Sequence, residues 1–569
     1  MDRRELAHIS PLRGAPLGTG GLPAWWTGVI YQIYPRSFAD SNGDGIGDLA
    51  GITSHLDYLA NTLGVDAVWV SPFFPSPMAD FGYDVSDYTD VDPIFGSLDD
   101  ADELIARAHE LGLHMIIDWV PNHSSDQHEW FRESRSNRHN SKRAWYVWKD
   151  PAPNGGPPNN WLSVFGGGAW ELDDTTNQYY LHSFLKEQPD LNWRNPALES
   201  AMHDTLRFWL DRGVDGFRID VAHYMMKDPS FRDNPIEATP RAGGKDRHHY
   251  DTQQHLYDKA HVDIHTTHTR IRAVLDEFDD RFSVGEIHET DWNRWAMYYG
   301  ENLDQLHMPY NFSLLWTPWT AHAFRRQIVA QESVLPAGAW PNHVLGNHDE
   351  PRIATRFGVH KVRAAAVLLL TLRGTATIYY GDELGLSDVA IPPGEEQDPW
   401  GKLYPDLNRD GCRTPMQWSL AAGMDFTRRD TNPWLPFSDP ATSVATQIDD
   451  EHSTLNLYRS LISMRKTRDE LAVGEIEMLD DNPGNVLSYS RTHGSATTCV
   501  AINFTDVTQR YEFPFEVMQI LSTHAGRDSS FCLVDLAPNE AIVAEQLPLT
   551  GIRDLSHERR QQGPEISEH

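Results

Sequence analysis

Short apolar runs alternate with amphipathic segments along most of the chain. The segments between the runs carry apolar residues at helical spacing, as in 99–110 and 201–210. This alternation is typical of parallel strands joined by helices, and it predicts an α/β fold, a (β/α)8 TIM barrel. The predicted strands are 29–34, 67–71, 115–120, 216–219, 282–285, 308–314, 343–346 and 375–380.

Two stretches break the alternation. Residues 124–193 follow the third strand, are rich in Trp, Asn, Gly and Pro, and lack helical periodicity, which predicts an inserted subdomain over the pocket. From residue 473 the pattern changes to alternating β-type runs bounded by turn residues, which predicts a C-terminal antiparallel β-sandwich over 473–553. The barrel then comprises 24–123 and 194–472.

Composition narrows the function classes. The chain has 569 residues, of which 40% are hydrophobic and 23% charged, as expected for a globular protein of two or three domains. Its formal net charge of -34 would repel nucleic acid and anionic membrane surfaces. A neutral small molecule is therefore the expected partner.

The cysteines and the hydropathy indicate a compartment. Cys412, Cys499 and Cys532 are an odd number without metal-type spacing, which favours a reducing environment. The first residues lack an apolar leader, and no run of 18 apolar residues follows. We expect a cytoplasmic protein without a membrane partner.

Three acids follow predicted strands. Asp220, Glu286 and Asp349 each stand at or just after a strand end. In a barrel these ends face a shared pocket where the chemistry is done. Several acids from different strands are typical of glycosidic bond cleavage, in which one carboxylate attacks the sugar and another protonates the leaving oxygen.

Electrostatics adds an expectation for two of these acids. Arg218 lies two residues before Asp220, on the same strand face, and could hold that carboxylate ionised. If Glu286 is the acid that protonates the leaving oxygen, it must begin protonated, so a less polar surrounding that raises its pKa is expected.

The segment 40–48, Asp-Ser-Asn-Gly-Asp-Gly-Ile-Gly-Asp, places oxygen ligands at alternate positions in a glycine-rich loop. It begins like an EF-hand, but Gly51 stands where the bidentate Glu would be, and the segment follows a strand. We predict a separate structural Ca²⁺ loop, with Mg²⁺ as an alternative and a metal-free turn as a second reading. The predicted ligands are Asp40, Asn42, Asp44, Ile46 and Asp48. No organic cofactor is expected.

Longer motifs resemble a known family. The sequences at 118–123, 216–220, 284–286 and 347–349 are similar, in order and spacing, to the four signature regions of the α-amylase family of glycoside hydrolases. The motifs at 31–38, 188–193 and 413–418 resemble its α-glucosidase and oligo-1,6-glucosidase branch. The match covers nearly the whole chain.

The resemblance implies roles. Asp220 would be the nucleophile, Glu286 the general acid/base, and Asp349 the carboxylate that stabilises the distorted sugar. The charged side chain of Asp80, with Tyr83 beside it, would close the end of the pocket, so that no further sugar could extend past it. This would enforce exo action. For Phe184, simple core packing is an equal alternative. The residues implied in substrate binding are Asp80, Tyr83, His123, Phe165, Phe184, Arg218, His348 and Arg413.

We therefore expect a retaining, exo-acting α-glucosidase that releases glucose from short α-glucosides. An α-transglucosylase and a sucrose- or trehalose-specific relative are the alternatives. Val221 resembles the α-1,6 branch, but Glu350 and Cys412 depart from it, so the linkage stays open. A non-catalytic relative would tolerate the loss of catalytic acids that are present here. The loops 234–261 and 389–409 are expected to shape the leaving-group side; oligomeric state has no signal.

Overall fold

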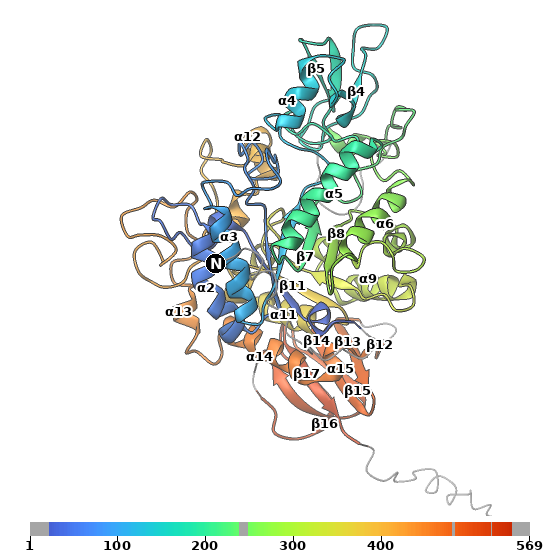
Figure 1. Ribbon diagram of the computed structural model, residues 1–569. Helices are drawn as coiled ribbons and strands as arrows, with labels where there is room; N and C mark the ends of the chain where they lie inside the picture. The colour runs from blue at the N-terminus through green and yellow to red at the C-terminus, as the bar shows by residue number, and fades with distance from the viewer. Residues whose placement is uncertain (1–21, 238–248, 481–483, 525, 549–569) are drawn as a thin grey trace, which may run out of the picture.

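The computed structural model describes residues 22–237, 249–480, 484–524 and 526–548. The polar leader up to residue 21, part of the loop 234–261 and the polar tail 554–569 lie outside the described residues. The described chain forms a central barrel, with the strands β4 and β5 at one end and the strands β12 to β17 at the other (Figure 1).

The barrel contains all eight predicted strands, so the fold prediction is confirmed. Its sheet is parallel and has the order β10-β11-β1-β2-β3-β7-β8-β9. Between the two end strands, Asn342 Nδ2 donates a hydrogen bond to the Pro309 carbonyl at 2.7 Å. This side-chain bond connects the two end strands of the sheet. The strands are β1 Val29–Ile33, β2 Ala67–Val70, β3 His114–Trp119, β7 Gly216–Ile219, β8 Phe282–Glu286, β9 Met308–Tyr310, β10 Asn342–Val344 and β11 Thr375–Tyr379.

The sixth barrel strand is shorter than predicted. β9 ends at Tyr310, and the helix α8 occupies Ser313–Trp316. The Asn311 side chain accepts the N–H of Ser313 at 2.7 Å. Such a local side-chain bond offers the backbone an alternative to the strand ladder and begins a turn. The prediction of a strand through residue 314 is therefore wrong at its end.

The barrel helices begin with recognisable caps. At the start of α3, Ser97 and Asp100 form a reciprocal capping box. Asn195 caps α5, whose first residue is Pro196. The longer helices are α2 Leu49–Asp57, α3 Leu98–Glu110, α5 Pro196–Asp211, α6 Ile264–Leu275, α9 Ala321–Val334, α11 Val362–Thr371 and α14 Thr454–Thr467. The shorter ones are α1 Pro35–Phe38, α4 Glu129–Ser136, α7 Trp292–Ala296, α10 Ile353–Phe357, α12 Pro399–Leu403, α13 Val444–Gln447 and α15 Asp469–Ala472.

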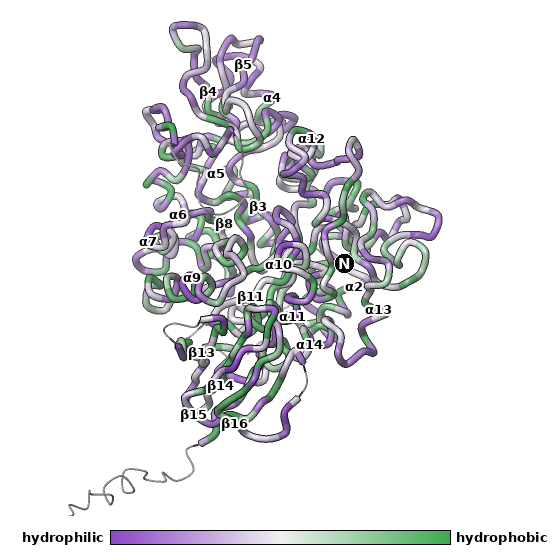
Figure 2. The backbone as a smooth tube through the Cα atoms, turned by 180° about the vertical axis from the view of Figure 1, so that it is seen from behind, coloured by the Kyte–Doolittle hydropathy of each residue, from purple (hydrophilic) through white to green (hydrophobic). Residues whose placement is uncertain are grey.

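The segment between β3 and β7 carries a small antiparallel sheet of its own. Its order is β4-β6-β5, with strands Trp148–Lys149, Gln178–Leu181 and Trp170–Asp173. Figure 2 shows hydrophilic loops around β4 and β5, in contrast to the more hydrophobic interior around α11. An antiparallel sheet over the mouth of a barrel places loop residues where they can contact a ligand.

The C-terminal strands form one six-stranded antiparallel sheet of order β12-β13-β14-β17-β15-β16. Leu487 and Ile502 belong to the main core of the barrel, whereas Val486 and Ala501 pack in a separate cluster. The two faces therefore alternate along each strand. The strands are β12 Glu475–Met478, β13 Val486–His493, β14 Ala496–Asn503, β15 Gln509–Ser522, β16 Phe531–Leu536 and β17 Ala541–Gln546. In the described part of the chain, no helix is long and apolar enough to cross a membrane.

Candidate active site

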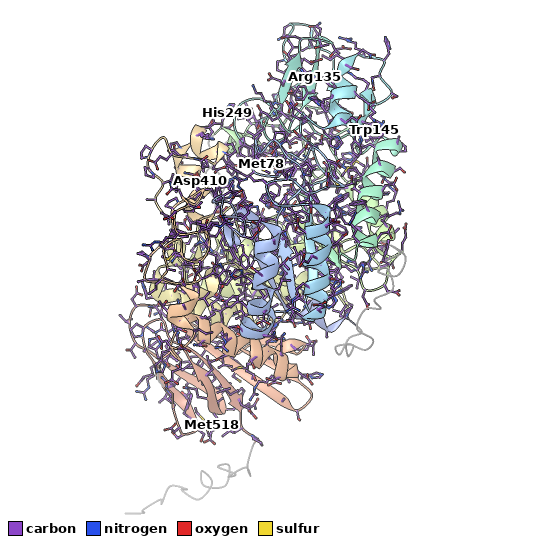
Figure 3. The ribbon with its side chains drawn as sticks, turned by 60° about the vertical axis from the view of Figure 1, so that its left-hand side comes forward. Met78, Arg135, Trp145, His249, Asp410 and Met518 are labelled. Carbon is purple, nitrogen blue, oxygen red and sulfur yellow. The ribbon has the colours of Figure 1, made fainter. Side chains whose placement is uncertain are left out.

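The three candidate catalytic acids lie around one cavity at the carboxyl-terminal end of the barrel strands. Asp220 directly follows β7, Glu286 is the last residue of β8, and Asp349 lies in the loop after β10. All three line one cavity that opens to solvent. In Figure 3, Met78 and Asp410 mark the part of the molecule near the inserted segment, and Met518 marks the opposite end.

The structure also brings together most of the residues implied in substrate binding. Six of them line the same cavity, and the other two, Arg218 and Arg413, are buried and contact the acids from behind. The six are Asp80, Tyr83, His123, Phe165, Phe184 and His348.

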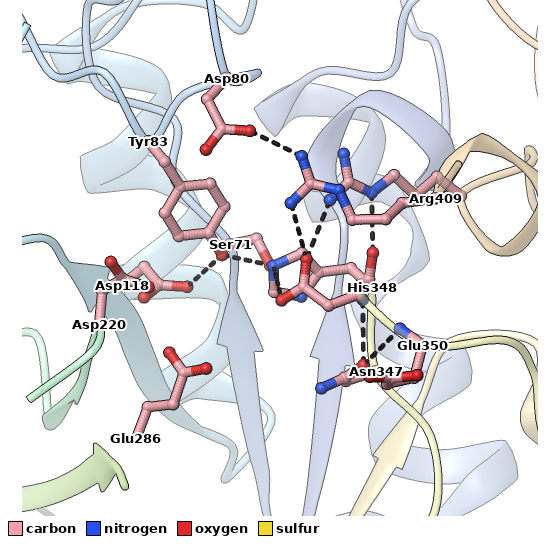
Figure 4. A network of polar contacts seen from close by, with 12 residues as sticks. Ser71, Asp80, Tyr83, Asp118, Asp220, Glu286, Asn347, His348, Glu350 and Arg409 are labelled. Carbon is pink, nitrogen blue, oxygen red and sulfur yellow. Dashed lines mark hydrogen bonds and ion pairs between the residues drawn. The ribbon is translucent and has the colours of Figure 1, made fainter. Parts of the chain in front are cut away.

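Arg218 connects three carboxylates. Its Nη1 lies 2.6 Å from Asp118 Oδ1 and 2.8 Å from Asp220 Oδ1, and its Nη2 contacts Glu286 Oε2. Figure 4 shows Asp118, Asp220 and Glu286 facing one another below Tyr83. One guanidinium cannot neutralise three buried carboxylates, so the cluster favours retained protons. In agreement, burial raises the pKa of Asp118 to about 6.

The protonation pattern reverses the expectation from the sequence. The ion pair between Arg218 and Asp220 is present, but burial and the nearby Glu286 charge raise the pKa of Asp220 well above its usual value. Although burial opposes ionisation, Arg218 and His288 lower the pKa of Glu286 below its usual range. The prediction of a surrounding that raises the pKa of Glu286 is therefore wrong. The reason is that the end of β8 brings this carboxyl within reach of two cationic groups.

Val221 and His288 complete the surroundings of Glu286. The Val221 N–H donates to Glu286 Oε2 at 3.1 Å, and His288 Nε2 lies 2.7 Å from Oε1. Val221 has a φ of 33°, which is unusual for a β-branched residue and costs about 1–3 kcal/mol. Strain of this kind concentrates at functional sites, and here it aims the N–H at the carboxylate. Sequence reasoning did not find His288, because nothing in the strand pattern marks it.

Asp349 is held by two arginines of the segment 409–413. Arg409 Nη1 lies 3.0 Å and Arg413 Nη2 3.1 Å from Asp349 Oδ1. Although burial opposes ionisation, His348, Arg409 and Arg413 lower the pKa of Asp349 well below its usual value. Asp349 is therefore an ionised acid suited to stabilising positive charge.

His348 is neutral and firmly positioned. Its Nδ1 contacts Gln32 Nε2 at 2.8 Å, and its Nε2 contacts the Tyr83 hydroxyl at 2.7 Å. The Tyr83 ring stacks on the imidazole with centroids 5.4 Å apart. Burial lowers the pKa of His348 to about 3. Both ring nitrogens are thus engaged by protein partners, and the neutral imidazole adds no charge to the cavity wall.

Arg409 is a functional candidate that the sequence did not reveal. It contacts Asp80 at 2.8 Å and Asp398 at 2.6 Å, in addition to Asp349. The loop 389–409 is expected on the leaving-group side, and its last residue, Arg409, contacts Asp80 across the cavity wall (Figure 4). The side of the cavity on which this loop acts stays a prediction. Contact between residues 80 and 409 depends on tertiary folding, and no local pattern signals it.

The inserted segment contributes the aromatic wall. Phe165 and Phe184 meet edge to face at 6.3 Å, and Phe184 lies 5.1 Å from the ring of His123. Both phenyl rings line the cavity, so Phe184 packs there and faces the site as well. His123 is buried, and burial lowers its pKa to about 4.

The loop 40–48 closes on itself through its own side chains. Asp40 accepts the N–H of Gly43 at 2.6 Å and of Gly45 at 2.7 Å, and Asp48 accepts that of Ser41 at 2.9 Å. Asp40 and Asp48 each accept four hydrogen bonds from protein donors, which occupies the lone pairs that a hard cation would need. Across the described residues, no group of three or more His, Cys, Asp or Glu side chains is arranged to hold a metal ion. The cation stays a prediction.

A parallel eight-stranded barrel with acids from separate strand ends in one cavity defines a glycoside hydrolase type of site. The family model of the α-amylase catalytic domain matches residues 32–474. The chain therefore belongs to the α-amylase family of glycoside hydrolases.

Relatives and solved structures agree on this family. A probable α-glucosidase from Rhizobium meliloti (strain 1021) is 45% identical over 519 residues, covering 88% of this chain and 93% of the relative. An oligo-1,6-glucosidase from Parageobacillus thermoglucosidasius is 35% identical over 535 residues, covering 87% and 93%. The crystal structure of an α-glucosyl transfer enzyme superposes with a TM-score of 0.87 at 42% identity, covering 92% of this chain and 99% of that one. A trehalulose synthase from Pseudomonas mesoacidophila MX-45 gives 0.84 at 33%, covering 92% and 100%.

Proposed function

We propose that this protein is a retaining, exo-acting α-glucosidase that releases glucose from the non-reducing end of short α-glucosides. The observation that carries the proposal is the shared guanidinium: Asp220 binds Nη1 of Arg218 and Glu286 binds Nη2. Carboxylates bonded to the two ends of one guanidinium lie close together. This favours the separation of about 5–5.5 Å of retaining enzymes over the wider gap that an inverting enzyme needs for its water.

The chemistry assigns one task to each acid. In its ionised form, paired with Arg218, Asp220 attacks the anomeric carbon while Glu286 protonates the leaving oxygen, which gives a covalent glucosyl-enzyme. Glu286 then takes a proton from the attacking water, and Asp220 leaves. Asp349, ionised beside two arginines, stabilises the positive charge that develops on the sugar.

The ion pair between Asp80 and Arg409 supports exo action. Asp80 Oδ1 and Arg409 Nη2 are 2.8 Å apart. The Asp80 side chain is only 7% exposed and the Arg409 side chain only 6%. A buried ion pair across the inner end of a pocket leaves no path for a further sugar. Only the terminal glucose unit then fits beyond the scissile bond.

Transglucosylation is the second candidate. This chain is 42% identical in sequence to the α-glucosyl transfer enzyme and 33% identical to the trehalulose synthase. Hydrolysis and transfer share the glucosyl-enzyme and differ in the nucleophile that resolves it. Aromatic side chains in the cavity wall favour a sugar acceptor over bulk water. They include Tyr224, Phe312, Trp316 and Trp400.

The test is the initial rate of glucose release from maltose, isomaltose, sucrose and trehalose, with oligosaccharide products followed in the same samples. Proton NMR of the first product formed reports the stereochemistry. We expect α-glucose first, from maltose or isomaltose. Growing oligosaccharides would favour transfer. Release of β-glucose first, or no product from any of the four substrates, would contradict the proposal.

We also propose that the loop 40–48 binds a structural divalent cation, Ca²⁺ before Mg²⁺. The support is the set of alternating oxygen ligands in a closed glycine-rich loop. Removing the metal with a chelator is expected to lower the melting temperature, and added Ca²⁺ should restore it. Asp44→Asn should weaken this response, because Asp44 is one of the predicted ligands. Asp44 is exposed, so its replacement leaves the barrel core intact. Equal melting curves with chelator and with Ca²⁺ would reject the cation.

The free thiols agree with a reducing, cytoplasmic location, which remains part of the proposal. Cys412 and Cys499 are buried and Cys532 is exposed. An exposed thiol oxidises readily outside a reducing compartment. Cell fractionation tests this location. Recovery of the protein outside the soluble cytoplasmic fraction would contradict it.

A further inference from the structure

His288 links Glu286 to the cavity. It lies in the loop after β8, its Nε2 is 2.7 Å from Glu286 Oε1, and 19% of its side chain is exposed. The ring also lines the cavity. A titratable group therefore contacts the candidate acid/base on one side and reaches the pocket on the other.

The two oxygens of Glu286 have different donors. Oε2 receives Arg218 Nη2 and the Val221 N–H, whereas Oε1 receives His288. A guanidinium and a backbone amide keep their protons at every working pH. Among these donors, imidazole alone exchanges its proton near neutrality. The variable proton at this carboxyl group is therefore on the His288 side.

Retaining hydrolysis makes a demand that Glu286 does not meet alone. The group must hold a proton for the first step and must be free of it for the second. Arg218 and His288, against the opposing effect of burial, lower the pKa of this carboxyl group below its usual range. A partner that stores the proton close by resolves this conflict.

We propose that His288 is a positioning residue that shares one proton with Glu286 and thereby sets the pH range in which Glu286 acts as the acid. The inference rests on the proposed glucosidase function. In one form the proton is on His288 Nε2 and Glu286 is a carboxylate; in the other His288 is neutral and Glu286 is a carboxylic acid. The leaving oxygen takes that proton as its bond to the anomeric carbon breaks. The attacking water later returns one to the pair.

The surroundings support a pair that exchanges its proton locally. On the β7 side, His223 Nδ1 contacts the Glu286 carbonyl at 3.2 Å, and its ring lies 5.4 Å from that of His288. On the α8 side the ring meets two aromatic side chains, Phe312 at 5.0 Å and Trp316 at 5.9 Å. The other charged groups on the segments around His288 bind other partners. Lys259 contacts Tyr224 and Tyr250, and Glu289 contacts Arg294. Glu350 accepts a hydrogen bond from Trp316, and Asp349 pairs with Arg409 and Arg413.

The experiment compares pH profiles of kcat/KM for the substrate that the wild-type protein cleaves. His288→Gln keeps a hydrogen-bond donor near the position of Nε2 but cannot titrate. We expect its alkaline limb to move to lower pH by about one unit, with the plateau changed by less than about threefold. His288→Ala should show the same shift and a plateau loss of about tenfold, because Glu286 also loses an orienting bond. Added imidazole should restore part of that loss.

A matched control separates this effect from a general loss of histidine. His322 is exposed in α9, so His322→Gln makes the same chemical change away from the site. Its pH profile should coincide with that of the wild type. Equal melting temperatures for all variants exclude a folding defect. A limb that stays in place in His288→Gln would overturn the proposal.

A second measurement does not depend on turnover. The ¹⁵N shift of the His288 ring, assigned from its absence in His288→Gln, is followed against pH in the wild type and in Glu286→Gln. Removing the carboxylate should change the midpoint of this signal, because the proton then has no partner to share it. An unchanged midpoint would overturn the proton sharing even if the protein cleaved no glucoside. A shifted midpoint without glucose release would support the pair and reject the proposed function.

Discussion

Strand β7 carries a buried aspartate at each end, and the two have opposite surroundings. Asp215 precedes the strand and Asp220 follows it. Their residues are equally buried, each 6% exposed. Asp215 contacts His109 at 2.8 Å and His114 at 3.6 Å, and it accepts the Met115 N–H at 2.8 Å. Asp220 shares Arg218 with two other acids.

The partners, not the burial, decide the difference. Although burial opposes ionisation, His109 and His114 lower the pKa of Asp215 below its usual range. Burial and Glu286 raise the pKa of Asp220. A charge whose pKa is lowered on folding stabilises the fold at neutral pH, and one whose pKa is raised destabilises it. Asp215, at the amino-terminal end of the barrel strands, therefore stabilises the fold. Asp220, at the carboxyl-terminal end where catalysis takes place, lowers the free energy of unfolding.

The largest expected effect is on activity and comes from replacing Asp220, the destabilising aspartate. Asp220→Asn should lower kcat by at least about 10³-fold, because the nucleophile is gone. The same change should leave the melting temperature equal or raise it, since a buried carboxyl group with a raised pKa is removed. Steady-state kinetics and thermal unfolding of the purified variant measure both quantities. Near-normal turnover, or a clear loss of stability, would break the comparison.

The sequence was sufficient for the barrel but not for all of its site. Apolar runs marked all eight strands, because parallel strands covered on both faces are nearly continuous in hydrophobic residues. The end of β9 was misplaced, because Phe312 and Leu314 continue the apolar run although Asn311 has already started a turn.

The residues that were missed depend on tertiary contacts. Asp220 and Glu286 stand at strand ends and could be found from the strand pattern. Arg409 reaches Asp80 across 329 positions of sequence, and His288 contacts Glu286 through the fold of a loop. The protonation of Glu286 could not be predicted either, because it depends on how Arg218 is shared. Distances of this kind are set by packing and leave no periodic signal.

The second expected effect tests the stabilising end. Asp215→Asn keeps an acceptor for the Met115 N–H but removes the charge that the histidines face. We expect a loss of about 2 kcal/mol, which lowers the melting temperature of a chain of this length by about 2 °C. Activity at moderate temperature should remain within about twofold, because the residue lies at the end of the barrel away from the cavity. His322→Gln on the exposed face of α9 serves as a control for surface substitution. A variant as stable as the wild type would show that the bottom cluster contributes little.

The smallest expected effect is the acid dependence of that difference. Because the pKa of Asp215 is lowered on folding, its stabilisation is complete above the unfolded value of about 3.9 and is lost as the pH falls through the folded value. The gap in melting temperature between wild type and Asp215→Asn should therefore be fully present near pH 5 and shrink below about pH 4. Thermal unfolding of both proteins across this range measures it. A gap that widens in acid would mean that Asp215 is protonated in the folded protein, and the contrast between the two ends of β7 would be lost.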